Sequence, residues 1–274
     1  MVNDEQKSYA YGIQSMLSNS GAVIAAFFPF LLTVLGVANT AKKGVVPQSV
    51  VISFYVGATI LVITSLLTVT KVHEYDPKTY ARYHGIKEED NKECGNWFEL
   101  LKKAPKVFWQ VSLVQLFCWF SFQYLSTYAT GAIAENVWKV TDPSSAGYQL
   151  AGNWFGVLTA VQSIAAVIWS YVLAKVPNYH HKVGYGISLL LGAIGYGSIF
   201  FVHSQNILIV SFILIGISWA AMNTYPLTMV SNALSGKHMG TYLGLFNCSI
   251  CLPQIIASLL SFILFPLMKY SMPA

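Results

Sequence analysis

The chain has 274 residues, of which 55% are hydrophobic and only 10% are charged. An average soluble domain carries about 25% charged residues, so this composition excludes a water-soluble globular protein and favours a membrane protein whose main partner is the lipid bilayer. The net charge of +5 does not indicate a nucleic-acid partner, because no basic run with interleaved aromatic residues is present.

Seven apolar blocks predict an all-α membrane protein with seven transmembrane helices. Each block is near or above the ~20 residues that cross the hydrocarbon core as a helix. The blocks are too long for single strands and lack period-2 alternation, which argues against a transmembrane barrel. The predicted spans are 11–37, 48–70, 107–131, 151–175, 183–203, 207–233 and 240–268.

Two glycine pairs inside these spans have a four-residue spacing: Gly152 with Gly156, and Gly240 with Gly244. Small residues at this spacing let helix backbones approach closely in lipid. We therefore expect close helix packing at both pairs.

One long polar segment, 71–106, separates the spans into two groups. Its 36 residues hold eight of the sixteen Lys and Arg and seven of the eleven Asp and Glu. Each such charge at mid-bilayer costs roughly 2.5–3.5 kcal/mol, so the segment is predicted to lie in water. The predicted division is two helices in 1–70, a cytoplasmic loop in 71–106 and five helices in 107–274.

The distribution of basic residues predicts the orientation. With the N-terminus in the cytoplasm, twelve Lys and Arg residues lie on the cytoplasmic side and four on the outer side. Cytoplasmic loops carry an excess of such residues, so a cytoplasmic N-terminus is favoured. This orientation argues against a seven-helix receptor, whose N-terminus lies outside.

Polar side chains inside the spans identify a candidate binding site, because such side chains normally face a bundle interior or a water-filled cavity. In span 107–131 they recur at three- and four-residue steps and so share one helical face. Gln14, Ser18 and Asn19 extend the polar set into the first span. The predicted solute-binding residues are Gln115, Trp119, Gln123, Tyr128, Asn153, Asn223, Asn247 and Gln254.

These candidates are amides, a phenol and an indole rather than charged groups. Amides donate and accept hydrogen bonds with sugar hydroxyls, and aromatic faces cover the apolar side of a sugar ring. The alternative for any single amide is a hydrogen bond between helices, worth about 0.6 kcal/mol on average.

No Asp, Glu, Lys or Arg lies in the middle of a predicted span. A proton-coupled carrier usually has a membrane carboxylate that carries the proton, and Glu135 near the end of span 107–131 is the nearest candidate. The sequence has no catalytic triad and no phosphate-binding loop, and the Cys248–Cys251 pair has no neighbouring His or acid. We therefore expect neither an enzyme nor a metal or cofactor site.

Three stretches carry a resemblance. The stretch from Gly216 has a Trp-containing helix, Tyr-Pro-Leu, Lys-x-Met-Gly, Gly-x-Phe-Asn and Pro-Gln; its residues are Trp219, Pro226, Lys237, Met239, Gly240, Gly244, Phe246, Asn247, Pro253 and Gln254. It resembles helices ten and eleven of the sugar:cation symporter group of the major facilitator superfamily, which includes the sucrose and maltose symporters. Residues 104–138 resemble the start of helix seven, and 4–15 with Pro29 resemble the segment leading into helix five.

The resemblance implies a partial major-facilitator fold, in which the seven helices are equivalent to helices five to eleven of twelve. An alternating-access carrier needs both halves around one site. The resemblance therefore implies that missing helices of the same carrier complete the site and hold the coupling carboxylate. Either this chain is a fragment of a longer reading frame, which we favour, or the missing part comes from another polypeptide.

The function expected from this resemblance is symport of a neutral sugar of the sucrose or maltose type with a proton or another cation. The expected location is a bacterial inner membrane. Two alternatives remain open: a facilitator of another neutral solute, such as a peptide or a drug, and a self-contained seven-helix receptor or scaffold.

Overall fold

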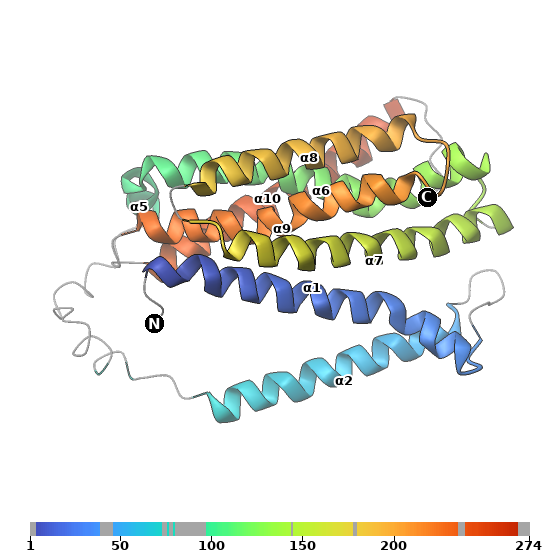
Figure 1. The fold of residues 1–274 in the computed structure, drawn as a ribbon, viewed down its shortest axis with the longest axis horizontal. Helices are drawn as coiled ribbons and strands as arrows, with labels where there is room; N and C mark the ends of the chain where they lie inside the picture. The colour runs from blue at the N-terminus through green and yellow to red at the C-terminus, as the bar shows by residue number, and fades with distance from the viewer. Residues whose placement is uncertain are drawn as a thin grey trace. The chain divides into compact units, whose positions relative to one another are not determined.

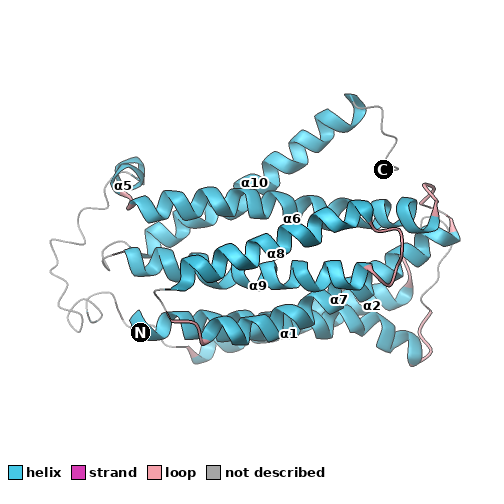
Figure 2. Ribbon diagram, turned by 45° about the horizontal axis from the view of Figure 1, so that its top comes forward, coloured by secondary structure: helices cyan, strands magenta, loops and turns pink. Residues whose placement is uncertain are grey.

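A computed structural model gives the structure of the chain and describes residues 4–38, 46–72, 76, 79, 97–143, 145–177, 180–234 and 239–267. These residues form eight helices and no strand (Figures 1 and 2). The all-α prediction is confirmed for this part of the chain. The helices are α1 (Asp4–Val34), α2 (Gln48–Lys71), α5 (Trp97–Lys103), α6 (Lys106–Trp138), α7 (Ala146–Ala174), α8 (His181–Phe201), α9 (Leu208–Ala233) and α10 (Met239–Leu267).

Each of the seven predicted spans corresponds to one long helix. Five of them, α2, α7, α8, α9 and α10, are long and apolar enough to cross a membrane. The other two, α1 with 31 residues and α6 with 33, are long enough but are not among these five. In α6, polar side chains such as Gln115 and Gln123 interrupt the apolar run. The count of seven spans therefore stays a prediction.

The structure differs from the predicted boundaries at several places, including the starts of α1 and α7, which lie seven and five residues earlier than predicted. Helix α6 continues seven residues beyond the predicted end at 131, until Lys139 adopts a left-handed conformation with φ 56°. The short helix α5 lies inside the segment predicted as a polar loop. Most of the remainder of that segment, 71–106, lies outside the described residues, as does Lys237 of the family signature.

Packing divides the chain into two compact units, residues 1–27 with 105–274, and residues 28–104. Helix α1 contributes its first part to one unit and its last turns to the other. The first unit contains all the polar pockets described below. The predicted division at 70 and 107 refers to the two halves of a carrier. The two compact units are defined by contacts within this chain and do not test that division, so it stays a prediction.

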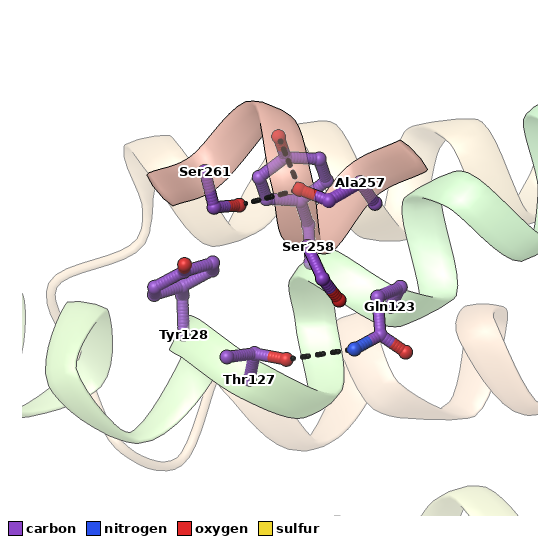
Figure 3. Close-up of a pocket in the computed structure, with 7 residues that line it drawn as sticks. Gln123, Thr127, Tyr128, Ala257, Ser258 and Ser261 are labelled. Carbon is purple, nitrogen blue, oxygen red and sulfur yellow. Dashed lines mark hydrogen bonds between the residues drawn. The ribbon is translucent and has the colours of Figure 1, made fainter. Parts of the chain in front are cut away.

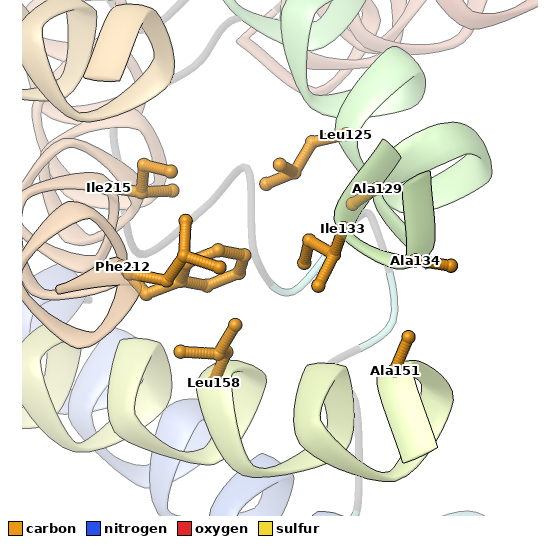
Figure 4. Close-up of a cluster of buried hydrophobic side chains, with 9 residues drawn as sticks. Leu125, Ala129, Ile133, Ala134, Ala151, Leu158, Phe212 and Ile215 are labelled. Atoms are coloured by element: carbon orange, nitrogen blue, oxygen red, sulfur yellow. The ribbon is translucent and has the colours of Figure 1, made fainter. Parts of the chain in front are cut away.

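Helix α9 lies at the centre of the first unit and contacts α6, α7, α8 and α10. It is the most deeply buried of the five apolar spans. A cluster of buried apolar side chains joins it to α6 and α7 (Figure 4). Phe212 and Ile215 come from α9, Ile133 from α6 and Leu158 from α7. This core fixes α9 as the element against which its neighbours are positioned.

Of the four glycines predicted at close helix packing, Gly152 is in ordinary contact with α6, where an added Cβ would lie 3.8 Å from Thr130 Cγ2. A Cβ added at Gly156, Gly240 or Gly244 would meet no atom within 4 Å among the described residues, so the prediction of close packing is wrong there. The tight positions are on the α1–α7, α7–α9 and α8–α9 contacts. At Gly216 of α9 an added Cβ would strike the main-chain carbonyl of Gln162 on α7.

Candidate functional site

The first candidate pocket lies between α1 and α9. We name it the α1–α9 pocket, and it has a volume of about 130 Å³. Residues recurring at three- and four-residue steps on α1 form one wall, as expected for a single helical face. Its lining residues are Tyr11, Gln14, Ser15, Ser18, Asn19, Trp219, Asn223 and Leu227.

Hydrogen bonds hold the wall contributed by α1 in place. The Ser15 hydroxyl lies 3.0 Å from the Ser170 hydroxyl of α7, and Trp219 Nε1 donates to Asn19 Oδ1 at 2.9 Å. Asn19 in turn donates from Nδ2 to the Ser15 carbonyl at 2.7 Å. These bonds fix both the amide of Asn19 and the ring of Trp219 at the edge of the pocket.

The second candidate pocket lies between α6 and α10 and has a volume of about 120 Å³. We name it the α6–α10 pocket; its lining residues are Gln123, Tyr124, Thr127, Tyr128, Ala257, Ser258 and Ser261. Figure 3 shows Gln123, Thr127 and Tyr128 of α6 around the same space as Ser258 and Ser261 of α10.

Local bonds orient the polar groups of the α6–α10 pocket. Gln123 Nε2 donates to the Thr127 hydroxyl at 3.3 Å, while the Ser258 and Ser261 hydroxyls donate to carbonyls one turn earlier on α10. The Tyr124 hydroxyl donates across to the Ala257 carbonyl at 3.4 Å. Gln123 Oε1 has no hydrogen-bond partner among the described residues, so it is available as an acceptor.

Three aromatic side chains connect α6 and α9 between the residues of the two pockets. We name Trp119, Phe122 and Trp219 the aromatic cluster. Phe122 stacks on Trp219 with ring centroids 4.2 Å apart, and Trp119 meets Trp219 edge-on at 5.5 Å. Trp219 lines the α1–α9 pocket, and Phe122 directly precedes Gln123 of the α6–α10 pocket. The cluster therefore packs α6 against the wall that α9 contributes to the α1–α9 pocket.

Both pockets are small and uncharged. Small-molecule sites typically enclose roughly 300–1,000 Å³, which is more than either volume given above. The lining side chains of both pockets are hydroxyls, amides, aromatic rings and aliphatic groups, without Asp, Glu, Lys, Arg or His. Each pocket is thus suited to one face of a neutral, hydrogen-bonding solute rather than to a whole oligosaccharide or an ion.

The structure brings some of the predicted site residues together. Gln123 and Tyr128 line the α6–α10 pocket, and Asn223 lines the α1–α9 pocket. Trp119 lies in the aromatic cluster with its Nε1 buried and without a partner among the described residues. Gln254 lies one turn before Ser258 and donates to the Ile250 carbonyl of its own helix at 3.0 Å.

Three predicted residues lie apart from both pockets. Gln115 is enclosed, with 1% of its surface exposed, and bonds to α8 and α9. Asn153 on α7 and Asn247 on α10 are exposed side chains outside the two pockets. Conversely, Trp219 and Phe122 were not among the predicted binding residues. Trp219 precedes Asn223 by four residues on the same helical face, and this spacing is the signal that would have found it.

A comparison with family models gives the affiliation of the chain. Residues 1–258 match the model of the Major Facilitator Superfamily. The chain belongs to the major facilitator superfamily. Members of the major facilitator superfamily are membrane transporters, so the chain is an integral, multi-pass membrane protein of a transporter family. Searches of curated proteins and of solved structures found no match.

In a member of the major facilitator superfamily, the polar side chains inside the bundle can have one of two roles. In a membrane transporter, polar side chains that are not turned to lipid line the path of the solute or bond between helices. The side chains of the α1–α9 and α6–α10 pockets border open space, although Ser15, Asn19, Trp219 and Tyr124 also bond between helices. Gln115 has the second role, because both ends of its amide are engaged inside the bundle.

Proposed function

We propose that the chain forms part of a carrier for a neutral, polyhydroxylated solute, a sugar of the sucrose or maltose type. The observation that supports this most directly is the pair of uncharged polar pockets, together with the aromatic cluster. Hydroxyls of a sugar can exchange hydrogen bonds with Gln123, Ser258 and Asn223, and the rings of the cluster offer an apolar surface to its C–H face.

The arrangement of the donors and acceptors favours hydroxyl groups over ions. Asn223 Nδ2 donates to the Trp219 carbonyl at 2.8 Å, which leaves Oδ1 turned to other partners. Gln123 Nε2 likewise donates within its own helix, to the Thr127 hydroxyl, which leaves Gln123 Oε1 as an acceptor for a solute. Two acceptors without a neighbouring charge suit a neutral solute that carries O–H donors, because a charged solute in a dry site would need a compensating charge.

We propose that transport occurs by alternating access in symport with a cation, a proton in the first instance. Neither pocket is lined by a carboxylate, so the coupling group belongs to a part of the carrier outside these two pockets. Further helices of the same carrier, equivalent to those that the sequence resemblance places before α1 and after α10, would complete the site. A bacterial inner membrane with a cytoplasmic N-terminus is the proposed setting.

A facilitator of another neutral solute is the second candidate function. The small volume of each pocket and its mixture of rings and hydroxyls also suit an amphipathic molecule. A panel of solutes decides between the two: a sugar carrier is competed by unlabelled sucrose or maltose, and a lipophile facilitator is not.

Replacing Gln123 or Asn223 by alanine is expected to weaken sugar binding. Each substitution removes an acceptor from a pocket, which costs about 1.5 kcal/mol and corresponds to a roughly 10-fold higher KM. The measurement is uptake of labelled sucrose and maltose by cells that express the carrier from its complete reading frame.

Ser121→Ala is the matched control for these variants. Ser121 lies on α6 as Gln123 does, but its hydroxyl donates to the Phe117 carbonyl of its own helix and lines neither pocket. Its KM is expected to equal that of the unmodified carrier. Unchanged KM values in both Gln123→Ala and Asn223→Ala, at normal expression, would contradict the proposed site.

A further inference from the structure

The main-chain hydrogen bonding of α9 is interrupted at Pro226. In an α-helix each N–H donates to the carbonyl four residues earlier, and proline has no N–H. The carbonyl deprived of this donor is that of Met222, a residue with only 3% of its surface exposed. Buried carbonyls without any donor are uncommon in proteins, so a replacement donor is expected nearby.

Gln115 of α6 supplies a donor at this carbonyl. Its Nε2 donates to the Met222 carbonyl oxygen at 3.2 Å. Its Oε1 accepts a hydrogen bond from the Tyr185 hydroxyl of α8, also at 3.2 Å. Gln115 and Tyr185 are both buried, so water does not compete for these bonds. One amide thus connects three helices at the proline.

Tyr225, the residue before Pro226, does not supply the missing hydrogen bond. Tyr225 is fully buried, but its hydroxyl has no hydrogen-bond partner among the described residues. The hydroxyl lies against α8, where a Cβ added to Gly184 would stand 2.7 Å from it. Gln115 is therefore the side chain that compensates for the break in α9.

We propose that Gln115 is a positioning residue, which replaces the N–H that Pro226 lacks and holds α9 in register with α6 and α8. Met222 directly precedes Asn223, and Trp219 lies one turn earlier, so the bond acts on the segment of α9 that lines the α1–α9 pocket. This role differs from the solute contact expected from the sequence. It goes beyond the proposed function, because it holds for any transported solute.

A double-mutant cycle between Gln115→Leu and Pro226→Ala tests the proposal in the purified full chain. Every protein in the cycle carries Tyr185→Phe, so that losing Gln115 leaves no hydroxyl unpaired on α8. With Pro226 present, Gln115→Leu is expected to lower Tm by about 4–8 °C. In the Pro226→Ala background, the alanine N–H donates to the Met222 carbonyl, and Gln115→Leu is expected to lower Tm by less than about 2 °C.

Gln110→Leu is the matched control, because Gln110 lies on α6 with an exposed side chain. It is expected to leave Tm unchanged in both backgrounds. The proposal would be overturned if Gln115→Leu lowered Tm equally in the presence of Pro226 and in the Pro226→Ala background. That result would mean that Gln115 acts independently of the proline. If Gln115→Leu folds only when it is combined with Pro226→Ala, the proposal is supported.

Infrared spectroscopy tests the same bond without a change at Pro226. In protein labelled with carbonyl-¹³C methionine, the Met222 amide I band is identified by its loss in Met222→Leu. Gln115→Leu is expected to move this band to higher wavenumber, because the carbonyl loses a hydrogen bond. An unmoved band would overturn the proposal, and this measurement stands even if Pro226→Ala does not fold.

Discussion

Trp219→Ala is expected to weaken sugar accumulation severely and to raise the KM of any residual uptake by about 30-fold or more. Trp219 contributes to the wall of one pocket and stacks on Phe122, which is adjacent to the other. Its loss removes two aromatic contacts, each about 0.5–1.5 kcal/mol beyond area burial, and one hydrogen bond of about 1 kcal/mol. The sum, roughly 2–4 kcal/mol, exceeds the 1.4 kcal/mol that corresponds to each tenfold change.

Two further variants separate the causes of this loss. Trp219→Phe keeps a ring for Phe122 but loses the bond to Asn19, so an intermediate KM is expected. Trp109→Ala removes an indole of the same size that is 51% exposed and meets Phe108, away from both pockets, so normal uptake is expected. A KM within about threefold of normal for folded Trp219→Ala would contradict the role of the aromatic cluster.

Gly216→Ala is expected to have the largest effect on stability. The main-chain carbonyl of Gln162 and the Cβ of Ala165, 2.9 Å away, occupy the position of the added methyl group. A carbonyl of a packed helix cannot move aside as the end of a flexible side chain can. We expect destabilisation of about 3 kcal/mol, at the upper part of the usual range for overpacking, with a much lower yield of folded protein.

Gly197→Ala provides the comparison for Gly216→Ala. Gly197 lies on α8, and a Cβ there would meet nothing within 4 Å among the described residues. An equal or higher Tm is expected, because alanine has the better helix propensity. The measurements are the yield of monodisperse protein after detergent extraction and Tm. Normal yield and Tm for Gly216→Ala would show that α7 and α9 do not pack as closely as described.

The existence of the long helices follows from the sequence because an apolar block in lipid must satisfy its backbone internally. The predicted span 48–70 and helix α2 differ by one residue at the end. Helix ends are less predictable where hydropathy and capping disagree. In α6 the apolar run stops before Glu135, yet the helix continues to the left-handed Lys139, because backbone geometry rather than polarity ends it.

The sequence predicts which types of side chain, uncharged amides and aromatic rings, form the candidate site. It predicts less well which neighbouring helix each of them faces. Periodicity places residues on one helical face, but it does not say which neighbouring helix that face meets. Gln115 and Gln123 are eight residues apart, which turns the helix about 80° beyond two full turns. Gln123 therefore borders α10, whereas Gln115 bonds to α8 and α9. Only the packing of the helices separates a pocket residue from a buried positioning residue.

Protection of single cysteines by sugar tests the central claim most directly. Cysteine is placed at position 123, 153, 223 or 247 in a carrier whose native cysteines are replaced by serine, and labelling by a water-soluble thiol reagent is timed. Sucrose or maltose is expected to slow labelling about 10-fold at positions 123 and 223, which line the pockets, and to leave positions 153 and 247 unaffected. Labelling at positions 123 and 223 that neither sugar slows would contradict the account.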